Sequence, residues 1–184
     1  YAYFTLDCID AAIKSSSCGD NPTVEMEAPE GFRYIWTKQG EPDNVLSTER
    51  VFDVPSTDTA TYYCSVEYLD TEGCGFSLHT AIIPRYPYAN FDYEIKPENC
   101  QNKVILTSKS GVRTKVDGQY VEYDEELATF YWTIDGKDWY TMGDTIVYIA
   151  PNEGETIDMN LEVGLATGNC TADTTIRIVI PPIH

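Results

Sequence analysis

The chain has 184 residues, enough for one or two domains, and 42% of them are hydrophobic, enough to bury a core. Its formal net charge is −18, from 30 acidic against 12 basic residues, which argues against binding to nucleic acid or anionic lipid. No apolar run approaches the roughly 20 residues that a membrane-spanning helix needs, so membrane insertion is not expected.

Short segments with alternating hydrophobic residues run through the whole chain. Val24 and Met26 alternate with glutamates, and Leu161, Val163 and Leu165 alternate further on. This period of two is typical of half-buried β-strands, and no segment has a helical pattern. Clusters of turn residues separate the strands, at 29–31, 40–43, 117–118, 135–136 and 151–154. The sequence therefore predicts an all-β fold.

The sequence also contains an internal repeat. Residues 1–7 read YAYFTLD and residues 88–94 read YANFDYE, which is an offset of 88 − 1 = 87 residues. Further along, "YIW" ending at Trp36 answers "FYW" ending at Trp132. A repeat of this length indicates two copies of one domain, and several short strands in each copy favour a β-sandwich.

The repeat places the domains at residues 1–87 and 88–184, joined by a short proline-containing linker at 84–87. Only the second copy has an insertion, around residues 111–129, which reads as an extra hairpin turning at Asp117-Gly118. The first copy ends at Ile83-Pro84 and the second at Ile180-Pro181, and another domain follows the first. We therefore expect neighbouring domains of a longer chain.

The cysteine count is six, and an even count without zinc-type spacing indicates disulfides in an oxidising compartment, hence an extracellular or cell-surface location. The pairs suggested by the repeat are Cys18 with Cys74 and Cys100 with Cys170. Cys8 and Cys64 have the apolar counterparts Ile95 and Leu161 in the second copy. They form either a third bridge or two buried thiols.

The stretch "DTATYYC" places Tyr62 two residues before Cys64, the spacing of a tyrosine corner, in which the phenol hydrogen-bonds back across a turn. Together with Trp36, it resembles the immunoglobulin superfamily. This resemblance implies a core containing Trp36, Tyr62 and, in the second copy, Trp132. The chain departs from antibody-type domains because Cys18 lies 36 − 18 = 18 residues before the tryptophan, at the mouth of its strand.

The second copy reads "ANFDYEIKPENC", "YWTIDG" and "LEVGLATGNC", and the first has "CGD", Tyr34-Ile35-Trp36 and "GC" in the same order. This layout resembles the immunoglobulin-like and polycystic-kidney-disease (PKD)-like modules of Bacteroidetes surface proteins. Residues 132–136, WTIDG, resemble the Trp-x-x-Gly-Asp-Gly turn of PKD domains without its full Gly-Asp-Gly. The resemblance implies a non-catalytic extracellular module that acts as a spacer, an adhesive domain or an accessory to glycan binding.

Catalytic and metal-binding residues are not evident. The two histidines, His79 and His184, sit in no motif with Ser and Asp, so we predict no enzyme and no catalytic residue. No protein ligand set for a metal is expected. Turn acids such as Asp135 and Asp138 leave calcium as the one cofactor to consider, and we expect them to be solvated.

Aromatic residues gather in and after the insertion of the second copy. Tyr120, Tyr123, Trp139 and Tyr140 could form a ligand platform for a glycan, because sugar rings stack on flat aromatic surfaces. The alternatives are a cover over one sheet face or a contact between domains.

These observations predict a non-catalytic cell-surface interaction or spacer module of a larger exported protein, binding a glycan or another surface protein. The alternative is a protein-binding ectodomain of the immunoglobulin superfamily. A bond between Cys18 and Cys64 would favour that alternative.

Overall fold

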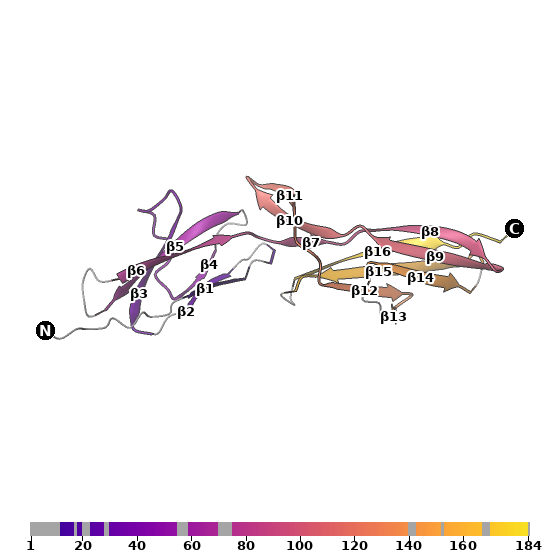
Figure 1. Cartoon of the computed structure of the whole chain (residues 1–184), viewed down its shortest axis with the longest axis horizontal. Helices are drawn as coiled ribbons and strands as arrows, with labels where there is room; N and C mark the ends of the chain where they lie inside the picture. The colour runs from indigo at the N-terminus through magenta and orange to yellow at the C-terminus, as the bar shows by residue number, and fades with distance from the viewer. Residues whose placement is uncertain are drawn as a thin grey trace. The chain divides into compact units, whose positions relative to one another are not determined.

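The computed structural model describes residues 12–16, 18–19, 23–27, 30–54, 59–69, 75–139, 143–151, 153–166 and 170–183. These residues form β-strands in five sheets, and none of them lies in a helix (Figure 1). The described part of the chain accordingly has no helix long and apolar enough to cross a membrane. The chain divides into two compact units, Tyr1–Pro84 with Thr114–Gln119, and Arg85–Arg113 with Tyr120–His184.

The first unit is a sandwich of two three-stranded antiparallel sheets. One sheet has the order β1-β2-β4 and the other β3-β5-β6. The strands are β1 (Ala12–Ser16), β2 (Thr23–Glu27), β3 (Phe32–Lys38), β4 (Val51–Asp53), β5 (Ala60–Tyr68) and β6 (Gly75–Ile82). The alternation in the sequence explains the layers, because Val24 and Met26 are fully buried while Glu25 and Glu27 are exposed.

Aromatic rings fill the core of the first unit. Trp36 and Tyr62 are both 0% exposed, and the ring of Phe52 lies between them at centroid distances of 5.5 and 5.9 Å. The indole Nε1 of Trp36 donates to the carbonyl of Glu49 at 2.8 Å. The Tyr62 hydroxyl has no hydrogen-bond partner among the described residues, and residues 55–58, which precede β5, lie outside them, so the tyrosine-corner hydrogen bond stays a prediction.

The second unit is built on the same plan. One sheet has the order β14-β9-β8 and the other β13-β12-β15-β16, all antiparallel. The strands are β8 (Phe91–Glu98), β9 (Gln101–Ser108), β12 (Thr129–Ile134), β13 (Lys137–Trp139), β14 (Thr145–Ala150), β15 (Thr156–Gly164) and β16 (Thr171–Val179). Two successive sandwiches with matching strand orders confirm the predicted all-β, tandem immunoglobulin-like architecture.

The registers show how closely the two cores correspond. Trp36 pairs with Cys64 between β3 and β5, and Trp132 pairs with Leu161 between β12 and β15. Trp132 is 0% exposed and packs edge-on against Phe91 at 5.2 Å. The thiol of Cys64 thus occupies the place of an isobutyl group in the second unit, as the repeat predicts.

A fifth sheet, of order β11-β10-β7, contains the insertion. It consists of β7 (Tyr86–Tyr88), β10 (Gly111–Val116) and β11 (Gln119–Tyr123). The hairpin turns at Asp117 and Gly118, which have φ of 51° and 76°. The segment expected to be a linker is therefore partly a strand, since β7 pairs with Gly111–Arg113.

The tip of this hairpin, Thr114–Gln119, belongs to the first unit. The backbone N–H of Thr59 donates to the carbonyl of Lys115 at 3.0 Å, and the Thr59 and Thr114 hydroxyl oxygens lie 3.2 Å apart. The first compact unit thus runs to Pro84 and includes the hairpin tip, while the predicted domain boundary after residue 87 stays a prediction.

The predicted pairing of Cys100 with Cys170 is wrong. Cys170 forms a disulfide, whereas Cys100 is an exposed free cysteine. Cys100 sits in the turn between β8 and β9, and the neighbouring Asn102 side chain donates to the carbonyl of Pro181, beyond the end of β16, at 2.8 Å. Cys170 lies just before Thr171, the first residue of β16, and is therefore at the opposite end of the sandwich.

The predicted bridge between Cys8 and Cys64 is also wrong, because Cys64 is a free, fully buried cysteine. The second prediction for this residue, a buried thiol, is the one that the structure has. Cys18 forms a disulfide, and both Cys8 and Cys74 lie outside the described residues.

Candidate functional site

The four residues predicted to form an aromatic platform do not come together as one surface. Tyr120 and Tyr123 lie in β11, in the sheet β11-β10-β7, whereas Trp139 ends β13 in another sheet. Three positions separate the two tyrosines, so the alternation of a strand directs them to opposite faces. Tyr123 lies under the guanidinium of Arg85, 5.8 Å from its ring centroid. Tyr140 lies outside the described residues, as does the side chain of Trp139.

A different set of residues forms a connected surface on one face of this sheet. Tyr86 and Tyr88 of β7 point to the same side, and Arg113 of β10 lies directly opposite Tyr86. Tyr120 and Glu122 of β11 complete it. We call these five residues the tyrosine patch.

Direct contacts join the members of the tyrosine patch. The guanidinium carbon of Arg113 lies 4.1 Å from the ring centroid of Tyr88. Arg113 Nε donates to Glu122 Oε1 at 3.0 Å, and the Tyr88 hydroxyl donates to Glu122 Oε2 at 3.1 Å. The rings of Tyr86 and Tyr120 meet edge to face, with centroids 5.2 Å apart. The patch is thus ordered before any partner arrives.

Gly111 makes room for the patch. It pairs with Tyr88 across β10 and β7, and a Cβ in its place would lie 2.8 Å from the Tyr88 hydroxyl oxygen and 3.1 Å from Cζ. Both distances are shorter than ordinary van der Waals contact. The absence of a side chain at Gly111 therefore lets the Tyr88 ring lie flat over β10 and reach Arg113 and Glu122.

The electrostatics of the patch favour the protonated forms of Tyr88 and Arg113. Burial raises the pKa of the Tyr88 hydroxyl, and its hydrogen bond to Glu122 raises the pKa further. The hydrogen bond to Glu122 also raises the pKa of the Arg113 guanidinium. Tyr88 is therefore a neutral donor and Arg113 a permanent cation in the folded protein.

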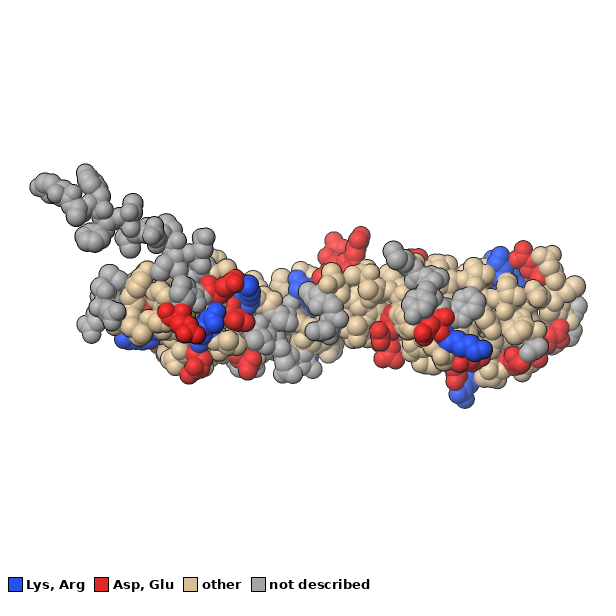
Figure 2. All heavy atoms as spheres, turned by 90° about the horizontal axis from the view of Figure 1, so that it is seen from below, with Lys and Arg blue, Asp and Glu red and all other residues tan. Residues whose placement is uncertain are grey.

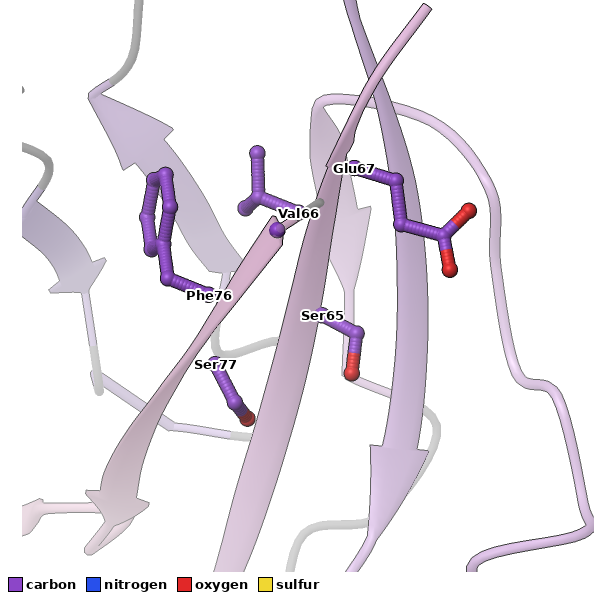
Figure 3. A pocket seen from close by; sticks show the side chains of 6 residues that line it. Ser65, Val66, Glu67, Phe76 and Ser77 are labelled. Carbon is purple, nitrogen blue, oxygen red and sulfur yellow. The ribbon is translucent and has the colours of Figure 1, made fainter. Parts of the chain in front are cut away.

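The sheet β3-β5-β6 of the first unit borders two hollows. One, of about 310 Å³, is lined by Ser65, Val66, Glu67, Gly75, Phe76 and Ser77 (Figure 3). The other, of about 540 Å³, shares Ser65 and Ser77 and extends to Tyr63 and Pro42. Small side chains border the part that the two hollows share, because Ser65 pairs with Ser77.

The described residues that line these hollows form no catalytic arrangement. Their serines have no histidine within the lining, because His79 lies beside the Tyr63 ring at 5.6 Å and exposed to solvent. Asp135, a candidate calcium ligand, accepts a hydrogen bond from the backbone N–H of Asp158 at 3.0 Å and so fixes a turn. Among the described residues, no three His, Cys, Asp or Glu side chains are grouped so that they could hold a metal ion.

Charge is spread over the surface. Figure 2 shows acidic side chains at many places on the face in view rather than in a single patch. Several acids are paired locally, for example Asp158 with Arg177 at 2.8 Å, and this hydrogen bond lowers the pKa of Asp158. On the face in view, the negative charge therefore defines no site by itself.

No protein-family model matches the chain, and no curated protein matches it. Among solved structures it is similar to three N-terminal domains of the highly immunogenic outer capsid protein Hoc of bacteriophage RB49, with 15% identity and a TM-score of 0.47 over 94% of this chain. It is also similar to a structure titled for Dscam isoform specificity, with 10% identity and a TM-score of 0.38 over 94% of this chain.

A third similar structure holds the N-terminal four immunoglobulin domains of Dscam1 isoform 7.44, with 11% identity and a TM-score of 0.33 over 93% of this chain. The chain spans 59%, 47% and 46% of these three structures, which is less than two-thirds of each.

Of the five patch residues, only Tyr120 was predicted from the sequence, whereas Tyr86, Tyr88, Arg113 and Glu122 were not. Tyr86 stands in a proline-containing segment that reads as a linker, and the pairing of that segment with the inserted hairpin is non-local. One signal was present: "YPY" at 86–88 alternates aromatic residues with a period of two, which is a strand pattern even with an internal proline at a sheet edge.

Proposed function

We propose that the chain is a non-catalytic, protein-binding segment of a larger exported protein, and that the tyrosine patch is its contact surface. Tyrosine and arginine are the residue types that contribute most often to binding energy at protein interfaces. Here they share one sheet face, and Tyr120 keeps 55% of its surface exposed. An extracellular location agrees with the disulfide-bonded state of Cys18 and Cys170.

The observation that carries this proposal is the packing of Arg113 over Tyr88, with Glu122 bonded to both. Such an arrangement loses little side-chain entropy on binding, since the rotamers are already selected. A pre-ordered Tyr-Arg surface on strands suits a protein partner.

The same geometry disfavours a glycan on this patch. Sugar rings stack on the open faces of aromatic rings, but Arg113 covers a face of Tyr88. Tyr86 and Tyr120 are perpendicular, at 89°, and so present no common plane. Glycan binding stays the second candidate, supported only by the exposure of Tyr120.

The test is a binding screen of the chain against a library of secreted and surface proteins, followed by affinity measurements on every hit. We expect Tyr120→Ala and Arg113→Ala to weaken a genuine hit by about 30-fold or more, the effect of about 2 kcal/mol at an interface hot spot. Tyr93→Ala is the matched control, because Tyr93 is 46% exposed on β8 and touches no member of the patch.

Equal affinity of the wild type and both patch variants would place the contact elsewhere. A parallel glycan array distinguishes the second candidate: a glycan signal lost in Tyr120→Ala, with no protein hit, would contradict a protein-binding role for the patch.

A further inference from the structure

β14 is an edge strand without the usual protection. It ends the sheet β14-β9-β8, and its six residues, TIVYIA, include no charge and no proline. On its outward face, Val147 is 45% and Ile149 is 43% exposed. Edge strands of soluble proteins normally carry charges, prolines or bulges that stop another strand from pairing with them.

The other edges of the second sandwich do carry such features. β8 contains four charged residues and Pro97, β16 contains Asp173 and Arg177, and β13 contains Lys137 and Asp138. β14 alone among these four edge strands lacks them. This contrast indicates that another strand can pair with β14.

The direction of its backbone groups follows from the register. The N–H of Ser108 donates to the carbonyl of Asp144 at 2.7 Å, and Ile146 and Tyr148 continue the pairing with β9. Successive residues of an antiparallel strand direct their N–H and C=O groups to opposite sides. The N–H and C=O groups of Thr145, Val147 and Ile149 therefore point away from β9, out of the sheet.

We infer that β14 pairs with β14 of a second copy of this chain, antiparallel, about a two-fold axis at Val147. In this register Val147 faces Val147 of the partner subunit, and Thr145 faces Ile149 of the partner subunit. Every outward-pointing residue then meets another outward-pointing residue, which is the condition for a hydrogen-bonded ladder. Two three-stranded sheets become one six-stranded sheet, and an isologous contact of this kind closes as a dimer.

The absence of charge on β14 fits a second copy as the occupant, because a charge on this strand would face a like charge of the partner subunit near the two-fold axis. Each chain carries a net charge of −18, so two copies repel one another over most of their surfaces. β14 brings no charge into the contact, and the nearest charge across the register on that face is Lys103, which is paired with Glu98 at 3.0 Å. A strand adapted to a basic partner would carry acidic residues, and β14 has none, whereas an identical strand matches it in polarity and register.

The experiment is sedimentation equilibrium of the full chain at protein concentrations up to about 1 mM, in low salt and in 1 M salt. We expect a monomer–dimer equilibrium whose dimer becomes more stable as the salt concentration rises. At 1 M salt the Debye length is about 3 Å, so the repulsion between the two acidic chains is screened. A dimer held by ion pairs would weaken instead.

Two substitutions on β14 test whether this strand forms the dimer contact. Val147→Lys adds a charge to the edge, and Val147→Pro removes an outward N–H while leaving every bond to β9 in place. Each should weaken dimerisation at least tenfold, the expected result of losing central ladder bonds. Val179→Lys is the matched control, since Val179 is 63% exposed on the charged edge β16, and it should leave the dimer unchanged.

Amide hydrogen exchange gives a readout that does not depend on a variant folding. At a total concentration ten times the dissociation constant, about one-fifth of the chains are monomeric, so the Val147 and Ile149 amides should exchange about fivefold more slowly than in dilute protein. The Ile146 amide, bonded to β9, should show no such dependence. A monomer at every concentration and salt, or a dimer indifferent to both Val147 variants, would overturn the inference.

Discussion

Replacing Gly111 by alanine tests whether the tyrosine patch is held as the structure indicates. Gly111 is not among the glycines with positive φ, so alanine meets no backbone strain there. The new Cβ would instead lie 2.8 Å from the Tyr88 hydroxyl oxygen and 3.2 Å from Cε1. The Tyr88 ring must then move away from β10, and it loses its position under Arg113 and beside Glu122.

The size of the effect follows from what is lost and what is gained. An exposed cation–π contact contributes about 0.5–1 kcal/mol, and the hydrogen bond from Tyr88 to Glu122 about 0.5–1.5 kcal/mol. Alanine also reduces the freedom of the unfolded chain, which stabilises the folded protein by about 0.4–1 kcal/mol. The net destabilisation is therefore about 1 kcal/mol, or about 4–8 °C in Tm for a unit of this size.

The assay is urea and thermal unfolding of Gly111→Ala in two backgrounds, the wild type and Tyr88→Ala. In the second background the obstructing ring is gone, so Gly111→Ala should change from destabilising to stabilising. A second readout is the Tyr88 pKa, measured by NMR, which should fall toward its ordinary value when the ring leaves Glu122. Equal stabilisation in both backgrounds would refute the reasoning, because it would mean that the ring moves aside without cost.

Three further outcomes are expected. A thiol reagent at pH 8 should label Cys100 and leave Cys64 unlabelled until the protein unfolds, because burial raises the pKa of Cys64 to about 12. Peptide mass spectrometry measures the labelling of each cysteine. Labelling of Cys64 in the folded protein would contradict its burial. Arg177→Gln should raise the pKa of Asp158, measured by carboxyl NMR, because the hydrogen bond from Arg177 lowers that pKa in the wild type. The contribution of this pair to stability is present above the ordinary carboxyl pKa and is lost as the pH falls through the lowered pKa of Asp158. A chain truncated after the predicted first domain should show a lower Tm than the same unit in the full chain, since the Thr59 N–H loses its acceptor, and an equal Tm would show that the hairpin tip is dispensable.

The fold was predictable because local patterns determine it. Two copies with strands of period two, each centred on a tryptophan, leave few alternatives to a pair of sandwiches. The strand register was also within reach, since the repeat aligned Cys64 with Leu161, and these residues face Trp36 and Trp132. Core positions tolerate either side chain because both are apolar and of suitable size.

The disulfides were not predictable from the same repeat. Matching Cys100 with Cys18, and Cys170 with Cys74, assumes that equivalent residues keep equivalent partners. A disulfide, however, requires Cα atoms within about 7 Å, and Cys100 and Cys170 lie at opposite ends of the sandwich. The position of a cysteine in the sequence does not show at which end of the sandwich it lies. The strand pairing in the structure is needed to place it.

The tyrosine patch was not predicted because it lies in a sheet that the internal repeat does not include. The two sandwiches share their layers, their tryptophans and their registers, so these features account for stability and cannot distinguish the two copies. The sheet of β7, β10 and β11 exists only where the second copy departs from the repeat, and it pairs a linker strand with an inserted hairpin. A patch that needs Gly111 on one strand, Tyr88 on the second and Glu122 on the third has no counterpart in the core. The hairpin tip belongs to the first unit, so packing accounts for Thr114–Gln119, whereas the patch residues outside the tip are explained by the proposed contact with a partner.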